Sequence, residues 1–246
     1  MDLAIYLLLG IASFLFVVVP ISGAFVLNPL LSLVTDPHSA VSIGAFFFFL
    51  NSATKAVIFR RDIKMEYVRK TLPLSLLAAP FGAALIGYIS PDILLIIIFL
   101  FALYFLFKKT FEFFSETPVP KKSGKLEISL MSILTGFMQG TGLGAGGSLR
   151  KMFLFSENLT IAEMNGTASM IGIWILAVSV ATRLVTKQVA FSQLIPILYL
   201  IPVMFLATWL GRKFLKKLTA RASSILIMVV MVVVCASVGL KILNLV

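Results

Sequence analysis

The sequence predicts an all-α integral membrane protein of two inverted repeats, each a broken or re-entrant helical hairpin followed by three transmembrane helices. Its 246 residues are 60% apolar and 13% charged, with a mean hydropathy of +1.07, far from the average of soluble domains. Several apolar runs reach the roughly 20 residues that cross a bilayer. A breaker cluster also interrupts an apolar run once in each half, which is the pattern of a transporter built from repeats.

The first repeat is expected at residues 1–114. Its first apolar run is interrupted at Pro20–Gly23, and the turn Asp36–Ser39 has good helix N-cap chemistry. The apolar segments between such turns are expected at Leu3–Val19, Ala24–Val34, Ala40–Phe59, Thr71–Ile89, and Ile93 to Phe107 or Phe114.

Residues 115–125 carry two prolines and three lysines and are expected to form a cytoplasmic linker. The second repeat, residues 126–246, has the same order of elements at an offset of 123 to 124 residues. Its apolar segments are expected at Leu126–Gln139, Leu149–Phe155, Ile161–Leu184, Phe191–Leu210 and Ser224–Leu243.

The basic residues distinguish two topologies. If each broken segment crosses the membrane once, the basic residues divide 14 against 7 between the two faces. If each is a re-entrant hairpin, the halves are inverted and the division is 16 against 3, with Arg183, Lys187 and Lys241 opposite and with Arg150 and Lys151, inside the hairpin, left uncounted. The positive-inside rule favours the second topology, which predicts cytoplasmic basic loops and both termini outside.

The glycine run between Thr141 and Ser148 is the expected centre of the site. Half-helices that end inside a membrane offer unpaired N–H groups and positive dipole ends to an anion, and glycine lets backbone approach a ligand closely. Arg150 is near enough to bind an oxyanion with its guanidinium, although it and Lys151 can instead snorkel to the headgroups. The candidate substrate-binding residues are Ser22, Gly23, Asn51, Thr141, Gly142, Gly144, Gly146, Gly147, Ser148, Arg150 and Thr167.

Other chemistry is poorly supported. The net charge of +11 does not indicate nucleic-acid binding, because the basic residues lie in short loops between spans. A single histidine, His38, and a single cysteine, Cys235, provide no metal site and no catalytic triad, so we expect no enzyme, metal or cofactor. All ten acids lie at segment ends or in loops, and Glu163 is expected in a first helical turn. For Asn51 and Thr167, interhelical hydrogen bonding is an equal alternative.

The order of these motifs resembles that of the TauE/SafE sulfite exporter family. The similarity runs over about residues 10 to 243 and rests on Ser22–Leu31, Pro37–Val41, a basic loop and a second copy that begins at Gly142–Gly147. The resemblance implies an inner-membrane, multi-pass permease for small anions such as sulfite and sulfoacetate. It places the glycine signature of the family on Gly142, Gly144, Gly146 and Gly147, with Ser22 and Gly23 as its first-half counterpart.

The leading hypothesis is a transporter of small anions such as sulfite or organosulfonates. It would hold the substrate between the two helix breaks and expose it alternately to each side, with export as the favoured direction. Uptake of a sulfur anion is the alternative among transporters, and a non-transporting membrane scaffold subunit is the alternative from another class. The expected partners are a small anionic substrate and membrane lipid, while a homo-oligomer stays open.

Overall fold

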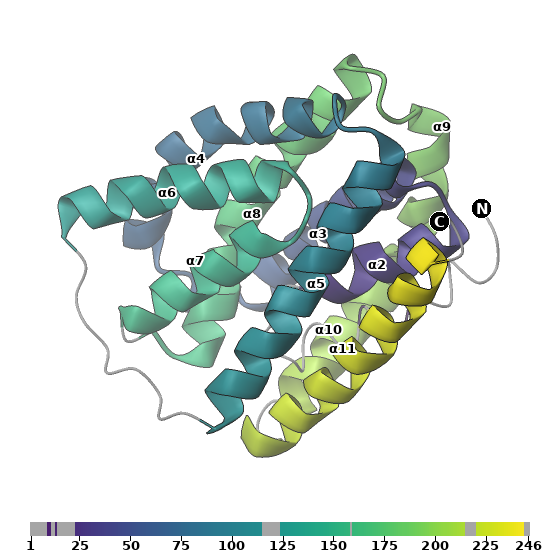
Figure 1. The fold of residues 1–246 in the computed structure, drawn as a ribbon. Coiled ribbons are helices and arrows are strands. Elements are labelled where there is room, and N and C mark those ends of the chain that lie inside the picture. The colour runs from purple at the N-terminus through teal and green to yellow at the C-terminus, as the bar shows by residue number, and fades with distance from the viewer. Residues whose placement is uncertain are drawn as a thin grey trace.

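The structure, a computed structural model, is all-helical in the part of the chain that it describes: residues 9, 10, 13, 23–114, 124–157, 159–214 and 220–243. This confirms the predicted helical class (Figure 1). The helices are α2 Ala24–Val34, α3 Pro37–Ile58, η1 Arg60–Asp62, α4 Met65–Ile86, α5 Pro91–Phe114, α6 Lys125–Gly140, α7 Ala145–Ser156, α8 Ile161–Val185, α9 Phe191–Leu194, η2 Ile195–Leu200, α10 Ile201–Phe214 and α11 Ala220–Leu243.

Three helical stretches within the described residues are long and apolar enough to cross a membrane: Pro37–Ile58, Ile161–Val185 and Phe191–Lys213. The third was expected as one span, but the structure divides it into α9, η2 and α10. Pro196 stands at the start of η2 and Pro202 at the start of α10. Because proline has no N–H to donate and crowds the preceding turn, it interrupts the α-helical hydrogen bonds there.

The two central helices begin with side-chain caps. Asp36 accepts a hydrogen bond from the Ser39 backbone N–H at 2.9 Å at the start of α3, as its N-cap chemistry predicts. At the start of α8, Thr160 and Glu163 form a reciprocal capping box. Glu163 also pairs with Lys64 at 2.6 Å. The expectation that Glu163 lies in a first helical turn is confirmed.

Helices α3 and α8 pack together at the centre of the molecule and run in opposite directions. The evidence is the contact of η1, which follows α3, with the beginning of α8, where the Lys64 backbone N–H donates to Thr167 Oγ1 at 2.9 Å. Helix α4 packs on α8, and α10 packs on α3 (Figure 1). Each half therefore places one helix against the central helix of the other half.

The contact between α4 and α6 depends on two glycines on one face of α6. A Cβ at Gly136 would lie 2.8 Å from the carbonyl carbon of Ser75, and one at Gly140 would lie 2.9 Å from Cα of Ala79. Ser75 Oγ donates to the Ser132 carbonyl at 2.8 Å across the same contact. Small residues spaced four apart let helix backbones approach in membranes, and here they fix the position of α6, which ends at the glycine run.

We predict that Gly136→Ala destabilises the protein by about 1–2 kcal/mol, because the cost of overpacking exceeds the gain in helix propensity. The matched control is Gly239→Ala in α11, where the new Cβ would meet the Phe99 ring at an ordinary 3.6 Å. Denaturant unfolding in detergent, followed by circular dichroism, measures both. Equal stability of the two variants would contradict the close approach of α4 and α6.

Candidate functional site

The second helix break is a short turn between α6, which ends at Gly140, and α7, which begins at Ala145. Gly142 has φ +76° and Gly144 has φ +96°, a left-handed backbone that side-chain-bearing residues rarely adopt. A Cβ at Gly142 would also lie 2.7 Å from Val41 Cγ1 of α3. Helix α7 was expected to begin at Leu149, but the chain returns to helix immediately after Gly144 and includes the later glycines.

Side chains from elsewhere satisfy the carbonyl groups at the end of α6. Arg183 of α8 is fully buried and donates through Nη2 to the carbonyls of Gly140 at 3.0 Å and Thr141 at 2.7 Å. Its Nη1 donates to Gln188 Oε1 at 3.1 Å. The topology count treated Arg183 as a charge on the face opposite the basic loops. In the structure the guanidinium is buried at the carbonyl end of α6, where the helix dipole is negative.

Gly23, the described residue of the first break, and Asn28 just after it lie at the second break. Asn28 of α2, which follows the first break, donates through Nδ2 to the Gly142 carbonyl at 2.6 Å. Gly23 from the first break and Gly142 from the second also line the same cavity. Residues about 120 positions apart in the sequence therefore form one site.

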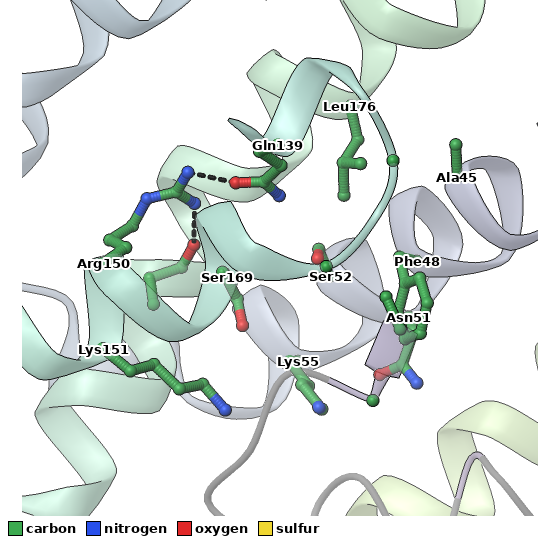
Figure 2. A pocket seen from close by; sticks show the side chains of 16 residues that line it. Ala45, Phe48, Asn51, Ser52, Lys55, Gln139, Arg150, Lys151, Ser169 and Leu176 are labelled. Atoms are coloured by element: carbon green, nitrogen blue, oxygen red, sulfur yellow. Dashed lines mark hydrogen bonds between the residues drawn. The ribbon is translucent and has the colours of Figure 1, made fainter. Parts of the chain in front are cut away.

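This cavity has a volume of about 90 Å³, room for several water molecules or one small ion, since one water needs roughly 10–15 Å³. Three cationic side chains line it, and none of its described lining residues is a carboxylate. The lining is Gly23, Ala24, Ala45, Phe48, Asn51, Ser52, Lys55, Gln139, Gly142, Gly144, Gly147, Arg150, Lys151, Ala168, Ser169 and Leu176 (Figure 2).

Arg150 is held within the protein. Its side chain is 3% exposed, Nη1 donates to the Ala168 carbonyl at 3.2 Å, and Nη2 donates to Gln139 Oε1. It therefore does not snorkel to the membrane surface, which was the alternative to a place in the site. Lys151 is less buried and points with Lys55 toward one end of the cavity (Figure 2).

Neutral polar groups complete the wall. Asn51 is 2% exposed, and neither atom of its amide has a hydrogen-bond partner among the described residues. Ser52 and Arg150 both lie close to Gly172 of α8, because a Cβ at Gly172 would be 3.2 Å from Ser52 Oγ and 3.5 Å from Arg150 Nη1. Since buried polar groups are rarely unpaired, the Asn51 amide is available to bond to water or to a ligand in the cavity.

The structure brings six of the sequence-derived candidates to this cavity. They are Gly23, Asn51, Gly142, Gly144, Gly147 and Arg150. Their assignment to substrate binding stays a prediction, because the geometry establishes only that they share a cavity.

The other candidates lie elsewhere. Thr141 Oγ1 donates to the Met138 carbonyl at 2.7 Å, and Thr167 accepts the bond from Lys64 at the start of α8. Gly146 packs on α6, where a Cβ would lie 2.6 Å from Gln139 Cβ. The Ser148 hydroxyl is buried without a partner in the described part of the chain, but Ser148 is not among the lining residues. Ser22 lies outside the described residues.

Sequence reasoning missed Lys55 and Gln139 as lining residues. Lys55 was counted as a loop charge because it stands in the last turn of α3. Its spacing of four residues from Asn51 was the available signal, because residues four apart share one face of a helix. Gln139 gave no signal, since it joins the site only through its contact with Arg150.

A comparison with protein families matches residues 5–238 to the family described as Sulfite exporter TauE/SafE. The match covers nearly the whole chain, including both breaks and every residue that lines the cavity. No curated protein and no solved structure matches the chain.

We predict that Gly142→Ala destabilises the protein by about 2–4 kcal/mol, from left-handed backbone strain together with the contact with Val41. In a Val41→Ala background that contact is absent but the backbone strain remains. Gly142→Ala should therefore cost less stability in that background than in the unmodified protein, but still cost some. Gly124→Ala, at φ −72° with no atom within 4 Å, is the control and costs at most about 1 kcal/mol. Thermal unfolding in detergent measures the series, and a Gly142→Ala variant as stable as the control would refute the strained turn.

Proposed function

We propose, since the chain belongs to the sulfite exporter TauE/SafE family, that it transports small sulfur-containing oxyanions across the membrane and binds them in the cavity between the two helix breaks. The observation that carries the proposal is the lining of the cavity. Lys55, Arg150 and Lys151 surround it, and no carboxylate is among the lining residues that the structure describes. Charged side chains inside a membrane protein are costly and mark ion or substrate pathways.

An oxyanion would relieve the electrostatic cost of this arrangement. Lys55 and Lys151 place like charges at one end of the cavity, and an anion bound near them would attract both. Each terminal nitrogen of Arg150 carries two N–H groups and uses one on Ala168 or Gln139, so one on each nitrogen remains. The Asn51 amide supplies a further donor that no described residue occupies.

Alternating access through inverted repeats is the mechanism we propose. The exchange of packing between the halves supports it, because α4 contacts α8 while its counterpart α10 contacts α3. The central helices α3 and α8 run in opposite directions, as inversion requires. Rocking of one half against the other would then expose the cavity to each side in turn.

Export from the cytoplasm is the direction we favour. In this topology the protein lies in the inner membrane, its basic loops face the cytoplasm and both termini lie on the opposite, outer face. Lys55 and Lys151 support this direction. They lie at the end of the cavity nearer the basic segment, which follows α3 and carries Arg60 and Arg61, and they would attract anions from that side. Uptake uses the same site, and transport assays in vesicles of both orientations distinguish the two. A non-transporting scaffold subunit gives no reason for a cavity lined by three cationic side chains and by no carboxylate among the described residues.

Binding is tested by thermal unfolding of the purified protein with sulfite, thiosulfate, sulfate, sulfoacetate and chloride. A ligand at 100 times its dissociation constant should stabilise the protein by about 2.7 kcal/mol. Asn51→Asp should weaken binding at least about tenfold, because the aspartate side chain has nearly the shape of asparagine but places a negative charge in the cavity. Gln193→Glu is the matched control, since Gln193 lies in α9 away from the cavity and needs only an acceptor oxygen there. Equal loss in both variants, or no shift with any sulfur anion, would contradict the proposal.

The charge of the lining also predicts which sulfonates bind. Isethionate and taurine share a two-carbon sulfonate but end in a hydroxyl and an ammonium group, respectively. Because the cavity is cationic, isethionate should bind at least about tenfold more tightly than taurine. Lys151→Glu should narrow or reverse this difference. Isothermal titration calorimetry measures both dissociation constants. Equal affinities in the unmodified protein would contradict binding at the described lining residues, which include cations and no carboxylate.

A further inference from the structure

A small apolar cluster lies beyond Ala45, the lining residue of α3 farthest from the basic segment. Leu143, between the two left-handed glycines, packs there with Val41 of α3 and Ile86 of α4, together with Leu94 and Ile98 of α5. Leu143 is 7% exposed and Val41 is fully buried. The turn that lines the cavity through Gly142 and Gly144 thus also carries a side chain of this apolar cluster.

Arg183 lies outside the cavity. It stands seven residues after Leu176, the last lining residue of α8, and so about 10 Å farther along the helix axis. Its Nη2 lies 3.1 Å from the position of a Cβ at Gly142, which lines the cavity, whereas Arg183 is not among the lining residues. Arg183 is therefore placed to act on the turn rather than on the anion.

A chain of hydrogen bonds connects Arg183 to Leu143. Arg183 binds the Thr141 carbonyl at 2.7 Å, and Thr141 Oγ1 accepts from the Leu143 backbone N–H at 3.3 Å. On its other side, Arg183 donates to Gln188, whose Nε2 donates to the Ala83 carbonyl of α4 at 3.0 Å. The guanidinium thus fixes the turn to both α8 and α4.

We infer that Leu143 is the gate at the far end of the cavity and that Arg183 is the positioning residue that holds this gate closed. The inference rests on the proposed function, in which the cavity is the anion-binding site. Opening requires the turn to move away from α5, and this movement breaks the contacts of Arg183 with the end of α6. Loss of the Arg183 contacts should therefore increase access from the far side and leave the anion-contacting groups in place.

The test is thiol labelling of an Ala45→Cys reporter in a Cys235→Ala background. Ala45 is the lining residue of α3 farthest from the basic segment, and Cys235 is the only native cysteine. A membrane-impermeant maleimide is added to each side of sealed vesicles of known orientation. Because the rate follows the population of the open state, Arg183→Lys and Leu143→Ala should each raise labelling from the far side about tenfold.

Matched controls separate the gate from general loosening. Arg212→Lys removes an arginine that also binds a backbone carbonyl, that of Ile58, but near the basic segment. Leu159→Ala removes a leucine of similar burial, 8% exposed, from another apolar cluster. Neither should raise far-side labelling. Gln188→Ala is a milder change that removes one link of the network, and it should raise labelling even if Arg183→Lys does not fold.

Unchanged labelling in Leu143→Ala, or in both Arg183→Lys and Gln188→Ala, would overturn the inference. Equal increases in the Arg212→Lys or Leu159→Ala controls would overturn it too, because they would indicate loosening of the whole protein. The assay uses no anion, so its failure is separate from failure of the proposed function. Anion affinity measured by calorimetry should stay within about threefold in Arg183→Lys, whose guanidinium does not line the cavity; a larger loss would make Arg183 a binding residue instead.

Discussion

Hydrocarbon offers no hydrogen-bond donors, so every carbonyl released where α6 stops must find a donor inside the protein. Three consecutive carbonyls do so. The Gly140 carbonyl accepts from Ser179 at 2.9 Å and from Arg183, the Thr141 carbonyl accepts from Arg183, and the Gly142 carbonyl accepts from Asn28. These donors come from α8 and from α2, so satisfying one helix end joins the two halves of the chain at a single place. The cavity lies there because the break can exist only where such donors meet.

The two arginines beside the break illustrate how position decides the role of a charge. Arg183 faces the carbonyl end of α6, where the helix dipole is negative, so its charge is compensated within the protein. Arg150 stands in the second turn of α7, near the positive end of that helix, and it shares the cavity with two lysines. Its charge adds to a positive field that the described lining does not balance. The charge of Arg183 is therefore compensated by a helix end, whereas that of Arg150 belongs to a cavity lined by cations.

Sequence reasoning predicted the helical class, the order of the segments and the place of the second break, because hydropathy and glycine clusters are local signals. The range Ala24–Val34 was predicted to the residue, while α4 begins at Met65 instead of Thr71 because its first turns are polar. For the candidate site, the pattern identified Arg150 and Asn51 but could not separate the roles of neighbouring glycines. Gly142 needs its left-handed backbone, whereas Gly146 needs closeness to α6. The contact of Arg183 with the end of α6 was not predicted, because a charge near the end of a span has the same sequence pattern whether it faces water or a helix end.

The ends of the cavity differ in ways that bear on how an anion would pass. Long, partly exposed lysines line the end near the basic segment, and such side chains can move with an ion at little structural cost. At the other end lie packed apolar side chains and a turn that is held through directed hydrogen bonds. Packed cores and directed bonds tend to switch between discrete arrangements instead of deforming gradually. An asymmetric cavity of this kind would load its anion readily from one side and release it to the other only when the turn changes conformation.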